Sequence, residues 1–83
     1  MQILYFAWVR EKIGTGAEEI LLPDDVRDVA GLVELLAARS PGHAAAFANR
    51  RSIRAAVNQD FATLSTPVAA GDEVAFFPPV TGG

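Results

Sequence analysis

Residues 28–36, which read Asp-Val-Ala-Gly-Leu-Val-Glu-Leu-Leu, contain the apolar stripe that decides the fold. Apolar side chains recur there at i, i+3, i+4 and i+7, a spacing typical of one face of an α-helix: Val29, Leu32, Val33 and Leu36. Asp28 stands just before the stripe and can cap the free N–H groups of the first turn, with Asp24 and Asp25 as alternative caps. Gly31 costs about 1 kcal/mol relative to alanine inside a helix, so we expect this helix to depend on packing.

The chain before this helix predicts a β-hairpin. Residues 3–9 are apolar throughout and include tyrosine, phenylalanine, tryptophan and valine, which favours a strand. Alternation along a strand would place one set of side chains on one face and the rest on the other: Ile3, Tyr5, Ala7 and Val9 against Leu4, Phe6 and Trp8. Residues 10–16 are polar with glycines and indicate the turn. Residues 18–22 predict the second strand, which Pro23 ends.

The chain after the helix predicts the remaining strands. The sequence Ser40-Pro41-Gly42 indicates the end of the helix. We expect a short helix at 43–49 and strands at 53–57, 61–64 and 73–77. Asn58-Gln59-Asp60 favours a turn after the third strand. Pro78-Pro79 ends the last strand, because neither proline can donate a hydrogen bond to a ladder.

Strands on both sides of one amphipathic helix predict a single sheet with the helix packed across one face. If the first and last strands pair in the middle of the sheet, they run parallel. The fold class is then α+β, a ubiquitin-like β-grasp with a mixed sheet of about four to five strands. We expect residues 1–77 to form this domain. The predicted core is Ile3, Tyr5, Val29, Leu32, Val33, Leu36, Val57, Val74 and Phe76.

Composition restricts the possible functions. The chain has 83 residues, no cysteine and one histidine, so it predicts neither a thiolate metal site, a disulfide scaffold nor a cysteine nucleophile. Its net charge of −3 argues against nucleic acid as a partner and suits a partner with a basic docking surface. No apolar run approaches the ~20 residues that span a bilayer, so we expect no membrane association. Residues 1–5 lack the basic start of a signal peptide, and we expect the cytoplasm.

Charged side chains within the domain do not suggest a catalytic or metal centre. The carboxylate pairs Glu18-Glu19, Asp24-Asp25 and Asp72-Glu73 are sequence neighbours, and neighbours on a strand point to opposite faces. We expect each pair to be a solvated turn or edge. His43 lies beside the helix stop and is interpreted as a loop residue. The cluster of Arg50, Arg51 and Arg54 is interpreted as a solvated loop.

The end of the chain carries the candidate chemistry. It reads Phe-Phe-Pro-Pro-Val-Thr-Gly-Gly over residues 76–83. Two prolines stiffen the exit from the last strand, and residues 78–83 can extend to roughly 20 Å. Gly82 and Gly83 have no side chains, so their backbone can enter a narrow pocket. We expect residues 78–83 to form an extended, flexible tail that presents a terminal carboxylate.

A terminal carboxylate becomes reactive once it is activated. Adenylation by an ATP-using partner would convert it into an acyl-adenylate, and a sulfur donor could displace AMP to leave a thiocarboxylate. This group carries sulfur without any cysteine, in agreement with the composition. Terminal glycines alone are weak evidence, since chain ends often fray. The Gly-Gly end gains weight from the predicted β-grasp order.

The chain resembles the small subunit of molybdopterin synthase, a ubiquitin-like sulfur carrier family. The resemblance lies in residues 71–83, Gly-Asp-Glu-Val-Ala-Phe-Phe-Pro-Pro-Val-Thr-Gly-Gly, in the opening Leu-Tyr-Phe-Ala-Trp-Val-Arg-Glu over 4–11, and in Ala-Ala-Val-Asn-Gln over 55–59. The C-terminal block is specific, whereas residues 14–51 are generic. The length of the chain also fits this family.

The resemblance implies a β-grasp fold and a role as a sulfur carrier. An E1-like adenylating enzyme would activate the Gly83 carboxylate with ATP, and a sulfur donor would install the thiocarboxylate. The tail would then enter the large subunit of molybdopterin synthase and donate sulfur to cyclic pyranopterin monophosphate. The complex would be a heterotetramer, in which the small subunit binds no cofactor or metal and is not catalytic alone.

The resemblance also implies which residues contact partners. Gly83 would carry the reacting carboxyl group, with Gly82 beside it. An apolar patch would dock both the adenylating enzyme and the large subunit, and the tail would fill the large subunit's active site. The partner-binding positions are Phe6, Phe61, Phe77, Pro78, Pro79, Val80 and Thr81. Trp8 is expected to extend the patch.

Three other functions fit parts of the sequence. A sulfur carrier for thiamine or tRNA thiolation would share the fold and the glycine end, although the Phe-Phe-Pro-Pro stretch favours the molybdopterin family. A ubiquitin-like protein modifier would use the same tail but would be attacked by a lysine instead of a sulfur donor. A plain interaction domain would keep its function without Gly83.

Overall fold

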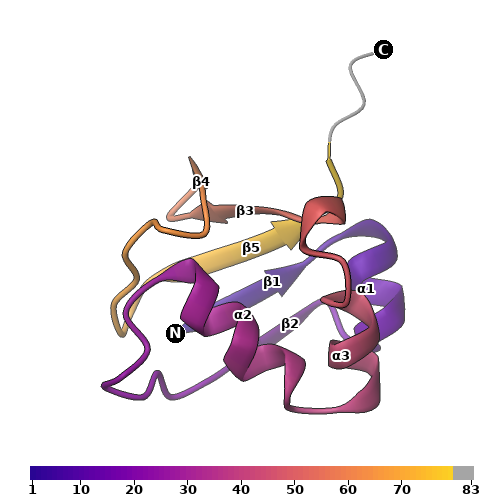
Figure 1. The fold of residues 1–83 in the computed structure, drawn as a ribbon, viewed down its shortest axis with the longest axis horizontal. Helices are drawn as coiled ribbons and strands as arrows, with labels where there is room; N and C mark the ends of the chain where they lie inside the picture. Colours follow the sequence, from indigo (N-terminus) through magenta and orange to yellow (C-terminus); the bar gives the residue numbers. More distant parts are fainter. Residues whose placement is uncertain (80–83) are drawn as a thin grey trace.

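The computed structural model describes residues 1–79, which form strands and short helices (Figure 1). The elements are β1 (Gln2–Tyr5), α1 (Ala7–Ile13), β2 (Ala17–Glu19), α2 (Val29–Ala37), α3 (Pro41–Ala46), the 3₁₀ turn η1 (Arg50–Ser52), β3 (Arg54–Val57), β4 (Asp60–Ala62) and β5 (Glu73–Phe77). No helix within these residues is long and apolar enough to cross a membrane.

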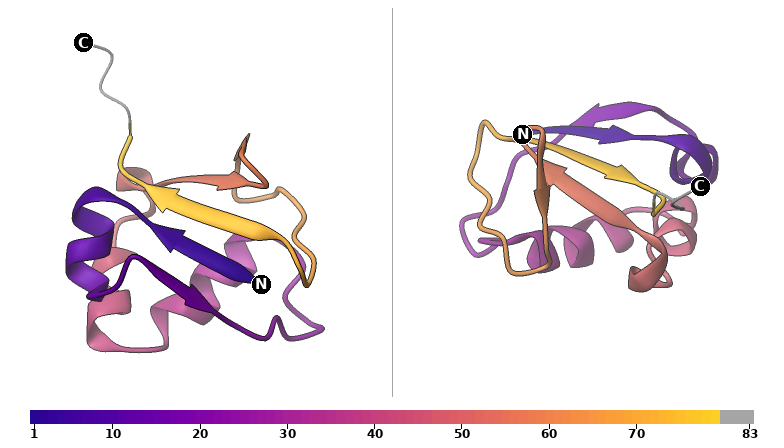
Figure 2. Two further views of the ribbon diagram at one scale, coloured as in Figure 1. Left: turned by 180° about the vertical axis from the view of Figure 1, so that it is seen from behind. Right: turned by 90° about the horizontal axis from the view of Figure 1, so that it is seen from above.

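The strands form one mixed sheet in the order β2-β1-β5-β3-β4. The first and last strands pair in parallel at its centre, with Ile3 opposite Val74 and Tyr5 opposite Phe76. The other pairs are antiparallel. Helices α2 and α3 lie on one side of the sheet, and α1 lies near its end (Figure 2). The predicted β-grasp arrangement, with its parallel central pair, is confirmed.

The hydrophobic core lies between the sheet and the helices. Eight of the nine predicted core residues are buried; the exception is Val57, which ends β3 opposite the exposed Asp60 and is only partly buried. The core also includes residues that the sequence did not indicate: Val9, Ile20, Ala46, Phe47, Ala55 and Val68. Phe47 contributes most among these, because its ring packs edge-on against Phe76 at 5.0 Å between centroids.

The first strand is shorter than predicted, and a helix replaces its second half. β1 ends at Tyr5, and residues 7–13 form α1 instead of continuing the strand. Helical spacing puts Val9 and Ile13 on one side, where Val9 is buried and Ile13 packs against the core. Gly14 ends α1 in the left-handed conformation at φ 97°, which favours glycine. The predicted turn over residues 10–16 is therefore confined to residues 14–16, and residues 10–13 belong to α1.

The helix signals near the centre of the chain are confirmed, with one addition. The Asp28 carboxylate accepts a hydrogen bond from the backbone N–H of Gly31 at 2.8 Å, so Asp28 is the cap of α2. Ser40 follows the end of α2, as predicted, but it also caps α3 by accepting from the N–H of His43. α3 starts at Pro41, a position where the missing N–H of proline costs nothing.

Candidate functional site

The central strand β5 positions the segment that the sequence analysis singled out. β5 is bonded to β1 on one side and to β3 on the other, and it ends at Phe77 as predicted. Pro78 and Pro79 follow directly and are partly buried. The predicted tail thus starts from the middle of the sheet, where its base is held on both sides. The predicted site residues Val80, Thr81, Gly82 and Gly83 lie outside the described residues.

The three phenylalanines predicted to bind partners, Phe6, Phe61 and Phe77, are here called the phenylalanine patch. Phe61 is 84% exposed and Phe6 49% exposed, while Phe77 is partly buried. The rings of Phe61 and Phe77 lie 6.1 Å apart between centroids. The N–H of Phe6 bonds to the carbonyl of Phe76 at 3.1 Å, which sets its backbone alongside Phe77. The rings of Phe61 and Phe77 therefore lie together, and the backbone of Phe6 lies beside the end of β5.

Trp8 does not lie on the strand face where the sequence analysis placed it. It belongs to α1, is partly buried, and packs against the core. Phe6 and Trp8 are thus separated by the change from strand to helix at residue 7. Patches of exposed aromatic side chains often mark interfaces, but docking by the phenylalanine patch stays a prediction.

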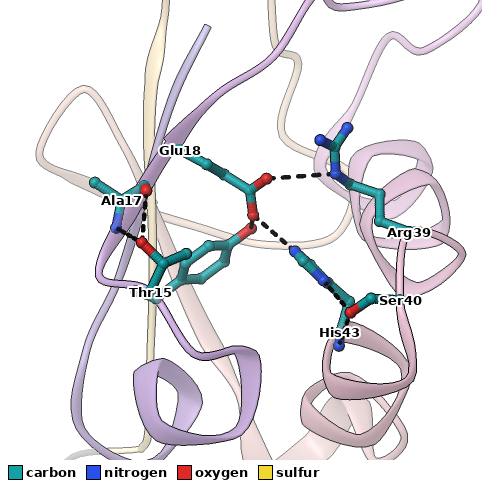
Figure 3. Close-up of polar contacts among 7 residues, drawn as sticks. Thr15, Ala17, Glu18, Arg39, Ser40 and His43 are labelled. Atoms are coloured by element: carbon teal, nitrogen blue, oxygen red, sulfur yellow. Dashed lines mark hydrogen bonds and ion pairs between the residues drawn. The ribbon is translucent and has the colours of Figure 1, made fainter.

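A second group of polar residues, which the sequence analysis missed, joins β1 and β2 to the helices (Figure 3). We call it the Glu18 cluster; it consists of Tyr5, Glu18, Arg39, Ser40 and His43. The Tyr5 hydroxyl and the His43 Nε2 each lie 2.7 Å from Glu18 Oε2. Arg39 Nε lies 3.3 Å from the other carboxylate oxygen. His43 Nδ1 lies 2.7 Å from the Ser40 hydroxyl.

The Glu18 cluster corrects two predictions. His43 is buried in α3 instead of lying in a loop, and Glu18 is bonded on an edge strand instead of being solvated. No local sequence pattern indicates the contact between Glu18 and His43, because the two residues are 25 positions apart in the chain. The expectation of a solvated side chain is confirmed for the neighbouring Glu19, which is exposed.

The electrostatics of the Glu18 cluster indicate a structural role. Burial by itself would raise the pKa of Glu18, but hydrogen bonds from His43 and Tyr5 outweigh it and hold the pKa below its ordinary value. Burial and the bond to Glu18 raise the pKa of the Tyr5 hydroxyl well above its usual range. Tyr5 is therefore a neutral donor to an ionised carboxylate. The hydrogen bonds and ion pairs of the cluster tie the sheet to the helices.

No second chemical centre is found within residues 1–79. No three histidine, aspartate or glutamate side chains there gather as metal ligands. Arg50 of the predicted arginine cluster is not simply solvated, since it pairs with Glu34 at 2.7 Å. The terminal carboxyl group of the chain is therefore still the strongest candidate for the reacting group.

Comparisons with known proteins show similarity in both sequence and fold. The sequence model of the ThiS family matches residues 3–83. The molybdopterin synthase sulfur carrier subunit of Escherichia coli is 45% identical over 83 residues, covering 100% of this chain and 99% of the relative. The protein of the same name from Haemophilus influenzae is 41% identical, with the same coverage. The crystal structure of small archaeal modifier protein 1 from Haloferax volcanii has a TM-score of 0.75 and 28% identity, covering 96% of this chain and 97% of that one.

Proposed function

The chain belongs to the ThiS family, and from that premise we propose that it is the sulfur carrier subunit of a molybdopterin synthase. The observation that supports this proposal most strongly is the similarity to two proteins named molybdopterin synthase sulfur carrier subunit. They are 45% and 41% identical to this chain, and the match covers 99% of each. Its role is to supply sulfur in molybdenum cofactor biosynthesis. It is not catalytic alone, and the large subunit of the synthase is its partner.

The proposed chemistry takes place at the carboxyl group of Gly83. An E1-like adenylating enzyme joins this carboxylate to the α-phosphate of ATP, and pyrophosphate leaves. A sulfur donor then attacks the acyl carbon and displaces AMP, so that a thiocarboxylate is left on Gly83. The absence of cysteine supports this route, because no thiol of the chain competes for the activated acyl group. ATP is bound by the adenylating enzyme, not by this chain.

Sulfur delivery is proposed from the sequence of the tail. Gly82 and Gly83 lack side chains, so their backbone is narrow enough to enter the active site of the large subunit, and Val80 and Thr81 are expected to contact that subunit. Pro78 and Pro79 fix the direction in which the segment leaves β5. The thiocarboxylate sulfur then bonds to a carbon of cyclic pyranopterin monophosphate as the oxygen on that carbon leaves. Water cleaves the resulting thioester, so that the sulfur stays on the pterin and Gly83 recovers its carboxylate. The phenylalanine patch supplies the apolar contact that docks each partner in turn. We expect this to take place in the cytoplasm, in a heterotetramer of large and small subunits.

A second function deserves a test because of one comparison. The structurally similar protein from Haloferax volcanii carries the name of a protein modifier. A modifier would use the same adenylated Gly83, but a lysine amine would attack it and form an isopeptide bond. The two functions differ only in the nucleophile that the activated carboxyl group meets.

Intact mass spectrometry distinguishes these functions. The chain is incubated with ATP, the adenylating enzyme of the same organism and a sulfur donor, both with and without a cell extract that supplies lysine acceptors. The sulfur carrier predicts a mass change equal to the replacement of one oxygen by sulfur, located on the C-terminal peptide. Covalent conjugates without any sulfur-loaded chain would instead establish the modifier.

A further inference from the structure

A cavity of about 290 Å³ lies on the helix side of the sheet, away from the Glu18 cluster. Its walls come from α2, η1 and the β3–β4 hairpin, and we call it the α2–β4 cavity. Apolar side chains form most of its lining: Val29, Val33, Phe47, Ile53, Ala62 and Leu64. Phe47 is fully buried and Leu64 is half exposed. The cavity therefore runs from the edge of the core to the surface.

The size of the α2–β4 cavity suits an anchoring side chain better than a cofactor. Pockets for whole small ligands measure ~300–1,000 Å³, and this one lies at the lower limit. Protein interfaces, in contrast, often place one large apolar side chain in a pocket of this kind, surrounded by groups that exclude water. The lining thus favours an apolar side chain from another protein.

The charges at the α2–β4 cavity favour a partner protein that has an acidic residue beside the apolar side chain it inserts. Two arginines belong to the lining. Arg50 is occupied, since it donates to the carbonyl of Phe47 and pairs with Glu34. Arg54 donates only to the backbone carbonyls of Arg51 and Ile53, at 3.0 and 3.1 Å. Among residues 1–79 no carboxylate lies within ion-pair distance of Arg54.

The α2–β4 cavity and the phenylalanine patch lie on opposite faces of the strand β4. β4 is the edge strand, and its successive residues Phe61 and Ala62 point to opposite faces. Phe61 thus belongs to the patch while Ala62 lines the cavity. Arg54 pairs in register with Phe77, the other member of the patch at this edge. A protein that binds Phe61 and Phe77 and extends around the edge strand β4 therefore contacts the cavity.

We propose that the α2–β4 cavity is a second docking point for the large subunit, which inserts a bulky apolar side chain there and pairs a neighbouring carboxylate with Arg54. This proposal rests on the proposed function, since that function supplies the partner. The partner then holds β4 from both faces. Such a grip holds the edge strand β4 and, through β3, the central strand β5, from which the sulfur-bearing tail leaves.

Two substitutions test the proposal, each with a matched control. Ala62→Leu fills part of the cavity from an edge strand, and the control Ala44→Leu adds the same side chain on the exposed side of α3. Arg54→Glu reverses the free cation, and Arg27→Glu makes the same charge change at a remote exposed site. The affinity of each variant for the large subunit of the same organism is measured by calorimetry. Circular dichroism and thermal melts check the fold.

We expect Ala62→Leu and Arg54→Glu each to weaken binding at least tenfold, while both controls bind within about twofold of the unmodified chain. Unchanged affinity of both test variants would overturn the proposal. If Phe77→Ala still weakened binding in that case, the proposed function would stand without the cavity. If the unmodified chain did not bind the large subunit, the proposed function itself would fail. Equal losses for Arg54→Glu and Arg27→Glu would show a general charge effect and overturn the role of Arg54.

Discussion

At the scale of single residues, Glu18 is the side chain on which most other contacts depend. Its carboxylate receives hydrogen bonds from Tyr5 on β1 and His43 on α3, and it pairs with Arg39. It thereby joins the edge strand β2 to the helical layer. Removing one partner from a buried group of this kind leaves the others without a hydrogen bond, which costs about 1–3 kcal/mol.

The lowered pKa of Glu18 predicts how stability depends on pH. The ionised carboxylate is favoured in the folded state, so its contribution is fully present above the unfolded pKa of about 4.3 and is lost as pH falls through the lower folded pKa. We expect Glu18→Gln to lower the free energy of unfolding by about 1–3 kcal/mol at pH 7. Urea unfolding curves at pH 7 and in the acid range measure this.

The neighbouring residue provides the control for Glu18. Glu19 is exposed, so Glu19→Gln should change the free energy of unfolding by no more than about 0.5 kcal/mol at either pH. The difference between Glu18→Gln and the unmodified chain should shrink on acidification. A difference that stayed constant down to the lowest pH would contradict the assignment of the charge to Glu18.

A second prediction at this scale concerns Phe77. Its ring lies beside that of Phe61 on the face opposite the core residue Phe76. Because truncating an aromatic anchor at an interface often costs ~2 kcal/mol or more, we expect Phe77→Ala to weaken large-subunit binding by about thirtyfold. Calorimetric titration measures the affinity. Leu21→Ala is the control, because Leu21 is 95% exposed and lies outside the patch; equal losses in both variants would remove Phe77 from the docking surface.

At the scale of elements, the contact between α1 and α3 depends on a glycine. A Cβ atom placed on Gly42 would lie 2.5 Å from the backbone carbonyl oxygen of Lys12, at the end of α1. The backbone of one helix must move to relieve such a contact. We expect Gly42→Ala to lower the free energy of unfolding by about 1–3 kcal/mol. Thermal and urea unfolding measure the loss.

Gly31 offers a matched control in α2. A Cβ atom there would lie 3.3 Å from a carboxylate oxygen of Asp28, a side-chain atom that can move. Alanine also favours a helix by about 1 kcal/mol over glycine. Gly31→Ala should therefore leave stability unchanged or raise it slightly. If Gly31→Ala and Gly42→Ala destabilised the chain equally, close packing of α1 on α3 would not be the cause.

Sequence periodicity predicted the long elements, but it failed near residue 6, where the short strand β1 is followed directly by the helix α1. The stripe in α2 and the alternation in β5 each continue long enough for one period to be recognised. Over residues 3–9 the composition fits a strand, but Val9 and Ile13 are also spaced for a helix that ends at Gly14. Burial of Val9 beneath α3 decides between these possibilities, and that contact cannot be derived from a window this short.

The candidate site was predictable in part, for a physical reason. The tail could be proposed from the sequence because glycine and proline act locally, through backbone width and stiffness, and its role stays a prediction. The Glu18 cluster was not found, since it requires the pairing of β1 with β2 and the position of α3 on the sheet. Likewise the α2–β4 cavity is formed by segments distant in sequence, and no local pattern predicts it.

At the scale of the whole molecule, the fold places the base of the proposed tail on the central strand β5. β5 has a hydrogen-bonded neighbour on each side, and its inward residues Val74 and Phe76 are fully buried. Core strands of this kind open only with free energies close to that of global unfolding. We therefore expect the base of the tail to keep its position when a partner binds. The chemistry can then be left to a backbone terminus that needs no side chain.

The central claim is that the Gly82–Gly83 end must be narrow enough to enter the large subunit. The most direct test measures sulfur delivery to cyclic pyranopterin monophosphate in a single turnover, using the chain with one tryptophan added after Gly83. Both chains are first converted chemically to the C-terminal thiocarboxylate, on Gly83 or on the added tryptophan, so that only the width of the end differs. The unmodified chain should give product, and the extended chain should give essentially none. Intact mass spectrometry verifies that the tryptophan is still attached. Full product formation by the extended chain with its tryptophan retained would contradict the account.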